Sequence, residues 1–323
     1  MPREIPFLKS ETGFPLLLAP IAGFTGLPLR TLCREYGADF VFTELTSTNA
    51  IYYGNKRTLP IIASAPEEHS RLSIQIFGHD LKTFDYAADF LTNRGGFAGI
   101  DLNLGCCVKK VLRAKSGCYL MQEPDHVQKI FRLLRPKIKG LFSCKIRLGY
   151  DDHNQNYLQI AGLAEDEGLD FVTLHARTRS QAFGGEIDYA AIAKAARELR
   201  IPVIGNGNVR DQESLSRIVS TGASGAMIGR AAIGNPFVFQ SLKAGLSGKT
   251  YAPDRAEVLA VLLRQGEAMI SFHGEQAAVR LMRKGLIPYL RGFAAAARFR
   301  ERLARLENAG EFHEMCDDLR REL

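Results

Sequence analysis

The sequence predicts an α/β protein, a (β/α)8 TIM barrel followed by a small all-helical C-terminal domain. Eight short apolar runs alternate with longer helix-forming stretches before Asn235, and polar or glycine residues follow most of these runs. The chain after Asp254 is rich in helix formers and has no further strand pattern. We expect the barrel over residues 1–247 and the helical domain over residues 248–323.

The eight predicted strands are runs of Val, Ile, Leu and Phe. They cover residues 16–18, 40–42, 72–76, 99–102, 142–146, 171–174, 203–204 and 226–228. Nearly unbroken apolar character is typical of parallel strands that are buried on both faces. An open, doubly wound sheet is the alternative. We prefer the barrel because one rim of a barrel collects every loop that follows a strand.

The C-terminal region begins after a linker-like stretch at residues 247–253, and we expect three or four helices there. Residues 280–305 hold eight basic side chains and one acid, which leaves 34 basic and 34 acidic residues elsewhere. Lys284, Arg291, Arg298 and Arg305 recur every seven residues, near one face of a helix that Pro288 interrupts. A solvated helix face is the alternative, but the near absence of acids favours a site for a polyanion.

Composition excludes several classes of protein. With 46% hydrophobic and 24% charged residues, the chain can bury a core and is neither disordered nor fibrous. The longest uncharged stretch, residues 12–29, contains three prolines and three glycines, so we expect no membrane span. The N-terminus lacks the pattern of a signal peptide, and we expect a cytoplasmic protein with no obligatory protein partner. Six scattered cysteines without a C-x-x-C pair predict free thiols and no metal site.

Chemically distinctive residues follow the predicted strands and would meet at one rim. Glycines after the seventh and eighth strands, in Asn206-Gly207-Asn208 and Gly229-Arg230, let backbone N–H groups approach an anion closely. Because such barrels often hold a phosphate at this place, the sequence implies a phosphate-bearing cofactor, although a plain turn is the alternative for each glycine.

Five further residues have a chemical interpretation. Lys145 lies within a strand and would stabilise negative charge on a ligand, unless it forms an internal ion pair. His175 is interpreted as a cofactor contact rather than a proton donor, and Asn103 either binds the edge of a flat heterocycle or forms a turn. Cys106 and Cys107 lie in a glycine-flanked turn, where a reactive thiol is more plausible than a buried one.

These residues, taken in order, resemble the signature set of the tRNA-dihydrouridine synthases, and most closely the bacterial DusB-like branch. The resemblance covers residues 16–305. It is carried by Pro20-Ile21-Ala22-Gly23, Asn103-Leu104-Gly105-Cys106, Lys109-Lys110-Val111, Ser116-Gly117, Cys144-Lys145-Ile146-Arg147-Leu148-Gly149, His175-Ala176-Arg177-Thr178, Gly205-Asn206-Gly207 and Met227-Ile228-Gly229-Arg230.

The resemblance implies an FMN-bearing barrel that reduces uridines in tRNA to 5,6-dihydrouridine, with NADPH as reductant and a helical domain that helps to hold the tRNA. It implies Cys106 as the proton donor, with Asn103 beside the uracil and Arg177 near the RNA. The cofactor contacts would be Pro20, Ile21, Ala22, Gln75, Lys145, His175, Asn206, Gly207, Gly229 and Arg230. From the basic C-terminal segment, RNA contacts are expected at Arg280, Arg283, Lys284, Arg291 and Arg298.

The sequence departs from the family pattern at four positions. Cys107 stands where a proline usually follows the catalytic cysteine, and Ile21, Asn208 and Gly285 stand in place of a methionine, an aspartate and a histidine. None of these changes removes the proton donor. A thiol is mostly protonated at neutral pH yet acidic enough to donate, which suits the role of general acid.

Two other functions remain open at this point. A flavin-dependent dehydrogenase of a free pyrimidine, of the dihydroorotate or dihydropyrimidine type, would use a similar barrel but has little use for a basic helical domain. The second alternative is an RNA-binding relative of the family that has lost catalysis. The sequence argues against it, because it retains Cys106, Lys145 and the predicted phosphate loops.

Overall fold

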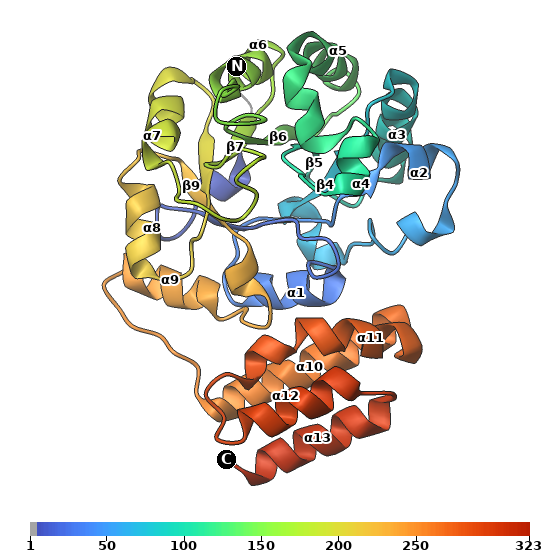
Figure 1. Cartoon of the computed structure of the whole chain (residues 1–323), viewed down its shortest axis with the longest axis vertical. Helices are drawn as coiled ribbons and strands as arrows, with labels where there is room; N and C mark the ends of the chain where they lie inside the picture. Colours follow the sequence, from blue (N-terminus) through green and yellow to red (C-terminus); the bar gives the residue numbers. More distant parts are fainter. Residues whose placement is uncertain (1–4) are drawn as a thin grey trace.

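The computed structural model describes residues 5–323 and contains a barrel of parallel strands ringed by helices, with a helical region below it (Figure 1). The eight barrel strands confirm the predicted fold class and the position of every predicted strand. They are β1 (Leu16–Leu18), β2 (Val41–Phe42), β4 (Leu72–Phe77), β5 (Gly99–Leu104), β6 (Leu141–Arg147), β7 (Phe171–His175), β8 (Val203–Asn206) and β9 (Gly225–Ile228). One further pair of residues, β3 (Thr46–Ser47), adds to the edge of β4.

The strands pair in the order β1-β9-β8-β7-β6-β5-β4-β2, all in parallel. A bridge between Leu17 and Phe40 brings the first and last strands of this order together, and the Leu18 N–H donates to the Phe40 carbonyl at 2.9 Å. The carboxylate of Asp39 strengthens this junction, because it accepts from the Leu16 N–H at 2.8 Å and from Lys243 at 2.7 Å. The sheet therefore closes into a barrel.

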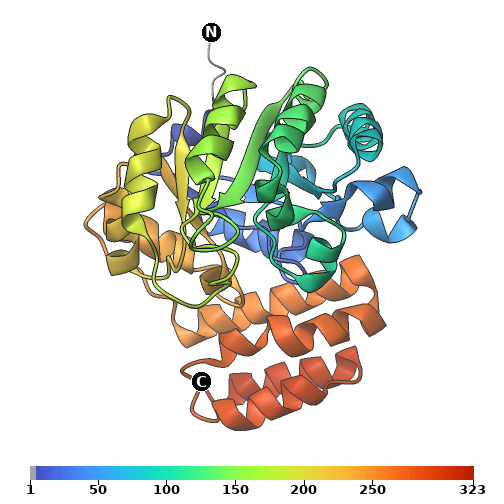
Figure 2. The same ribbon diagram turned by 45° about the horizontal axis from the view of Figure 1, so that its top comes forward.

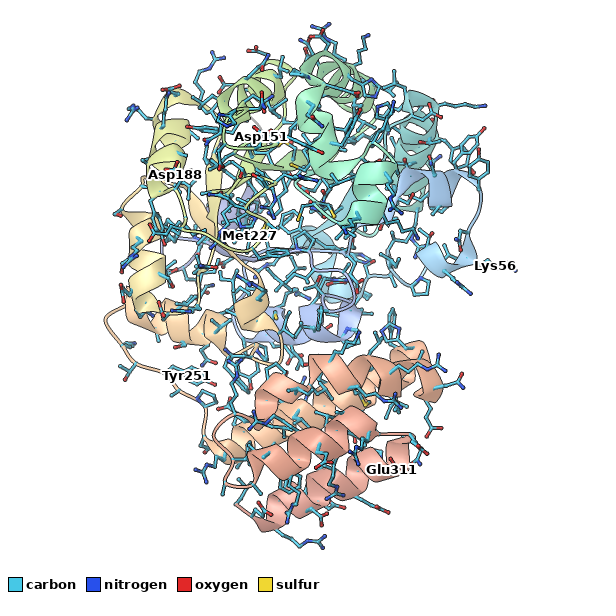
Figure 3. All side chains as sticks on the ribbon, in the orientation of Figure 1. Lys56, Asp151, Asp188, Met227, Tyr251 and Glu311 are labelled. Atoms are coloured by element: carbon cyan, nitrogen blue, oxygen red, sulfur yellow. The ribbon has the colours of Figure 1, made fainter. Side chains whose placement is uncertain are left out.

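Alternate strand residues form two separate cores. Side chains that point outward, such as Leu16 and Ile74, pack against the surrounding helices. Those that point inward form an apolar cluster that includes Phe42 and Met227, and Figure 3 shows Met227 at the centre of the barrel. The inner cluster fills the N-terminal half of the barrel, so ligands have access only from the opposite rim.

The helices of the barrel follow the strands in sequence. They are α1 (Leu27–Glu35), α2 (Thr48–Tyr52), α3 (Leu81–Arg94), α4 (Lys109–Arg113), α5 (Pro124–Leu134), α6 (Tyr157–Asp166), α7 (Tyr189–Glu198), α8 (Gln212–Val219) and α9 (Val238–Leu246). α3 illustrates how the sequence sets their limits. Asp80 caps its first turn by accepting from the Lys82 N–H at 3.0 Å, and Phe84, Ala87 and Leu91 form its buried face.

Short 3-10 helices lie between these elements. They are η1 (Pro6–Leu8), η2 (Lys56–Thr58), η3 (Pro66–Arg71), η4 (Gly117–Gln122), η5 (Arg230–Ala232) and η6 (Ile287–Leu290). In η1, the ring of Phe7 lies 4.9 Å from that of Phe40 and 5.2 Å from that of Phe171, measured between centroids. Phe7 thus extends the apolar filling of the barrel.

The C-terminal region contains α10 (Arg255–His273), α11 (Glu275–Gly285), α12 (Ala296–Arg305) and α13 (Ala309–Arg321), as both views show (Figures 1 and 2). Its apolar core is continuous with the barrel through Leu32 of α1 and Phe237. Tyr36 reinforces this contact, because its hydroxyl donates to Glu257 of α10 at 2.9 Å. No helix among residues 5–323 is both long and apolar enough to cross a membrane.

Candidate active site

The inward-facing side chains change from apolar to polar at the C-terminal ends of the strands. Gln75, Asn103, Lys145, His175 and Asn206 lie there, on five consecutive strands of the barrel. The strand register places Asn103 beside Lys145, and His175 beside Asn206. The barrel thus brings these predicted site residues together at one rim.

A buried hydrogen-bond network supports this polar layer from below. Asp101 accepts hydrogen bonds from the Gln75 amide at 2.8 Å and from the Ser143 hydroxyl at 2.6 Å. Gln75 in turn accepts from the Asn103 amide at 2.8 Å. Burial raises the pKa of Asp101 to about 6, against the opposing effect of these donors and of Lys145. The chain of bonds fixes the orientation of Gln75 and Asn103.

Asn103 also holds the loop that carries Cys106. Its Oδ1 atom accepts from the backbone N–H of Gly105 at 3.2 Å and from that of Cys106 at 2.9 Å. The Cys106 carbonyl then accepts from the Cys118 N–H at 3.0 Å. Gly117 lies against this loop with φ +63°, and a Cβ atom there would lie 2.9 Å from the Cys106 carbonyl oxygen. Only glycine fits this approach without a shift.

The thiol of Cys106 is half-buried at the rim. Burial raises the pKa of Cys106 above its ordinary value, while the backbone N–H of Val108 acts in the opposite direction. The thiol therefore carries its proton at neutral pH. All six cysteines are free, and Cys106 and Cys107 are the two that are not fully buried.

Arg147 at the end of β6 links the cysteine loop to the loop after β7. Its guanidinium donates to the Gly105 carbonyl at 2.8 Å, to the Thr178 carbonyl at 2.9 Å and to the Ala182 carbonyl at 2.8 Å. A fourth contact reaches the sulfur of Cys107 at 3.7 Å. Sequence reasoning assigned no role to this residue, because the nearest of these partners, Thr178, is 31 residues away in the chain.

The rim carries a strongly positive electrostatic field. Burial, followed by the charge of Arg147, lowers the pKa of Lys145 to about 7, while Asp101 acts to raise it. Burial together with the charges of Lys145, Arg147, Arg177 and Arg230 holds the pKa of His175 far below its ordinary value. His175 is therefore neutral, and the site attracts an anion.

The loops after β8 and β9 form a cradle suited to a phosphate. Gly207 has φ +149°, and a Cβ atom there would lie 2.3 Å from the side chain of Ile187. Asn208, in the left-handed region at φ +53°, accepts through Oδ1 from Arg230 at 3.0 Å and from Arg177 at 3.3 Å. The backbone amides and cations of this cradle match the donor set that a phosphate needs.

The other predicted contacts near the cradle come from β8, β9 and the loop after β1. The Asn206 amide donates to the Met227 carbonyl at 2.7 Å and fixes the start of the β8 loop. The loop 20–22 is held by Ile21, whose N–H donates to Thr25 at 2.7 Å. A Cβ atom on Gly229 would lie 3.6 Å from the Ile21 side chain, so Ile21 borders the cradle, with Pro20 and Ala22 on either side of it in the chain.

Arg177, which is predicted to lie near bound RNA, is buried in this structure and only 1% exposed. Its Nη2 atom donates to the Gly185 carbonyl at 2.7 Å, which ties down the loop after β7. An arginine that directly follows a strand is read from sequence as a surface cation, and only the folded loop reveals that it is buried.

The same loop presents an aromatic ring that sequence reasoning missed. Phe183 is 58% exposed, and the guanidinium carbons of Arg147 and Arg230 lie 5.7 Å and 5.4 Å from its ring centroid. These cation–π contacts hold the ring above the rim, between the cysteine loop and the phosphate cradle. A lone phenylalanine in a polar loop carries no sequence signal for this position.

The basic residues of the C-terminal region fall into two groups. Arg280, Lys284 and Arg291 are exposed, and no ion pair within residues 5–323 involves them. Arg283 instead donates to the Leu306 carbonyl at 2.9 Å, and Arg298 pairs with Glu322.

The seven-residue spacing does not describe one helix face, because α11 ends at Gly285 and α12 begins only at Ala296. Pro288 lies in η6 between the two helices and lacks the N–H that a continuous helix requires. The basic residues therefore come from two helices and the segment that joins them.

Fold and site together define an enzyme of the (β/α)8-barrel class, and comparison with known proteins identifies its family. The model of the dihydrouridine synthase (Dus) family matches residues 17–323. The chain is 36% identical over 298 residues to tRNA-dihydrouridine synthase B of Pseudomonas syringae pv. tomato, which covers 91% of this chain and 87% of that protein. It is 35% identical over 300 residues to tRNA-dihydrouridine synthase B of Escherichia coli (strain K12), with 92% of both chains covered.

A third relative agrees with these two. The chain is 34% identical over 288 residues to tRNA-dihydrouridine synthase B of Vibrio vulnificus (strain CMCP6), which covers 88% of this chain and 89% of that protein. The chain therefore belongs to the dihydrouridine synthase family, a family of oxidoreductases, as the sequence motifs predicted.

Proposed function

We propose that this protein reduces uridines in tRNA to 5,6-dihydrouridine, using FMN as cofactor and NADPH as reductant. The family match and the names of the relatives support the reaction. The observation that carries the proposal is the half-buried thiol of Cys106, in a loop held by Asn103 at a barrel rim lined with cations. Because its substrate is a cytoplasmic RNA, we propose a cytoplasmic location.

The rim residues fit FMN by the chemistry of their donors. Asn206, Gly207, Gly229 and Arg230 would hold the phosphate in the cradle after β8 and β9. Toward the barrel axis, the ring and ribityl chain would contact the residues predicted for them, Pro20, Ile21, Ala22, Gln75, Lys145 and His175. When bound at these residues, FMN would supply the hydride for one carbon of the uracil double bond, with NADPH as the source of the electrons.

Cys106 would donate the proton to the neighbouring carbon. Burial keeps the thiol protonated until the substrate arrives, and Asn103 fixes the backbone of its loop. Asn103 is 7% exposed and already hydrogen-bonded through both side-chain atoms, so it would present a fixed polar group to the edge of the uracil. We expect this positioning of Cys106 to contribute as much to the rate of uridine reduction as the acidity of the thiol does.

Lys145 would provide the positive charge that the reaction needs beneath the substrate. Its pKa of about 7 means that a negative charge placed next to it would bring the ammonium back to full protonation. A fixed cation costs no reorganisation when negative charge develops on a bound group. Neutral His175 would act as a hydrogen-bonding partner only, because its pKa is too low for it to carry a proton.

The helical region would hold the tRNA while one uridine enters the barrel. A uridine must leave its stack to reach Cys106, which costs a few kcal/mol that phosphate contacts offset. Arg280, Lys284 and Arg291 are free to make these contacts. Arg283 and Arg298 would contribute less, because both already hold a partner within the protein.

The proposal is tested with the purified protein, FMN, NADPH and unmodified tRNA. Dihydrouridine is measured by mass spectrometry of the digested RNA, and free uridine serves as the parallel substrate. We expect dihydrouridine in the tRNA and none from free uridine. Reduction of the free nucleoside at the same efficiency would contradict the RNA-directed function and favour a pyrimidine dehydrogenase.

A further inference from the structure

A cluster of aromatic side chains lies on the surface of the barrel at α2 and α3. The ring of Tyr52 packs edge-on against that of Tyr53, with centroids 5.0 Å apart, and against that of Tyr86 at 5.3 Å. Tyr53 is 79% exposed and Tyr86 is 46% exposed. Single exposed apolar side chains are normal on a protein surface, whereas a contiguous cluster of them marks a contact surface.

Basic side chains border these rings. The Lys82 ammonium lies 5.3 Å from the centroid of the Tyr52 ring. Lys56 and Arg57 are exposed on η2, where Asn55 caps the helix by accepting from the Arg57 N–H at 3.0 Å. No ion pair within residues 5–323 involves any of these three cations. We call this set the tyrosine surface: Tyr52, Tyr53, Lys56, Arg57, Lys82 and Tyr86.

Three acidic residues on or beside α3 are close in sequence to Lys82 and Tyr86. Asp85 and Asp89 both bind Lys137, each at 2.7 Å. Asp80 caps α3 by accepting from the Lys82 N–H, and its charge also acts on the Lys82 ammonium. Lys56 and Arg57 therefore supply the unpaired positive charge of the tyrosine surface, beside its open aromatic faces.

The tyrosine surface stands beside the candidate active site. α2 and η2 belong to the connection from β3 to β4, and α3 follows β4, so both connections leave the rim at which Cys106 lies. α4 begins three residues after Cys106 and carries the exposed Lys109 and Lys110. Lys56 lies at the outer edge of this side of the barrel (Figure 3).

We propose that the tyrosine surface binds an unpaired loop of the substrate tRNA, with a base stacked on Tyr53 and phosphates placed at Lys56 and Arg57. This inference rests on the proposed function. Aromatic rings interleaved with unpaired cations suit single-stranded nucleotides, because the rings accept any base face and the cations follow the backbone. The tRNA would then be held on the barrel as well as on the helical region, with the active site between the two contacts.

Two variants test the aromatic and the electrostatic contributions separately in the full-length holoenzyme. In Tyr53→Ala, the loss of one stacked base weakens binding of fluorescent tRNA about tenfold, whereas Tyr53→Phe retains the affinity. In Lys56→Ala with Arg57→Ala, two phosphate contacts to an unpaired strand are lost, and the slope of log K against log salt falls by about 0.7 for each. Lys194→Ala with Arg197→Ala, which removes two exposed cations from α7 across the barrel, is the matched control.

The outcomes separate this inference from the proposed function. Reduction of the flavin by NADPH stays unchanged in every variant, which shows that the barrel is intact. Parent-like tRNA affinity in both Tyr53→Ala and the Lys56 and Arg57 double variant would overturn the inference, even if the parent makes dihydrouridine. A second result would also overturn the inference. If the parent protein forms a dimer, and the Lys56 and Arg57 double variant dissociates that dimer without any change in tRNA affinity, the tyrosine surface binds protein. A parent that binds tRNA through this surface but makes no dihydrouridine would contradict the proposed function alone.

Discussion

Asn103 connects the buried network to the cysteine loop, so replacing it tests how the site is positioned. Asn103→Ala removes three hydrogen bonds: the one donated to Gln75 at 2.8 Å and the two accepted from Gly105 and Cys106 at 3.2 and 2.9 Å. At about 1 kcal/mol each, these bonds contribute about 3 kcal/mol to the free energy of unfolding. A displacement of the Cys106 loop by about 1 Å should slow uridine reduction roughly a hundredfold.

Urea unfolding and single-turnover oxidation of the reduced flavin by tRNA measure the two effects of Asn103→Ala. Asn235→Ala is the control, because Asn235 is exposed and its side chain donates one hydrogen bond, to the Ala231 carbonyl at 3.1 Å. We expect this control to lose about 0.5 kcal/mol. If Asn103→Ala loses no more stability than Asn235→Ala and turns over at the parent rate, the network does not position the cysteine.

Three further predictions concern the cofactor, the proton donor and the RNA. Gly207→Ala should weaken FMN binding about tenfold in an absorbance titration, because alanine is strained at φ +149° and its Cβ would lie 2.3 Å from Ile187, whereas Gly162→Ala, on α6 with open space around the Cβ, should keep the flavin. The single-turnover rate should stay constant through neutral pH and fall only as pH rises through the raised pKa of Cys106, since the thiol must be protonated. A rate that has already fallen completely below about pH 8 would refute the assignment of Cys106 as proton donor. Arg280→Ala with Lys284→Ala should lower the salt dependence of tRNA binding and leave NADPH oxidation by an artificial acceptor unchanged. If the salt dependence of tRNA binding is unaltered, these residues form a solvated helix face and do not bind RNA.

The barrel could be predicted because each buried strand is an apolar run with its own local signal. The run at residues 142–146, for example, lies within β6, which spans Leu141–Arg147. β3 escaped prediction because Thr46–Ser47 is polar and only two residues long. Strand ends also indicated which residues meet at the rim, since every parallel strand of a barrel points toward the same face.

Contacts between distant residues could not be predicted in this way. Asp101 looks like an isolated acid within a strand, and its partner Ser143 is 42 residues away. Arg177 and Arg283 look like surface cations in the sequence, yet each binds a backbone carbonyl that only the folded chain brings near. The charge of a residue is local information, whereas its hydrogen-bond partner is set by tertiary structure.

Cys106 is the proposed proton donor, and its neighbour Cys107 provides a matched comparison. Single-turnover oxidation of the reduced flavin by tRNA is measured for Cys106→Ala and Cys107→Ala, with tRNA affinity determined in parallel. Cys106→Ala should bind tRNA normally and reduce uridine about 10²- to 10⁴-fold more slowly. Cys107→Ala should reduce uridine at a rate within a few-fold of the parent rate. The Cys107 sulfur contacts Arg147, whereas the hydrogen bond that holds the loop on Asn103 comes from the Cys106 N–H. An inactive Cys107→Ala beside a normally active Cys106→Ala would contradict the assignment.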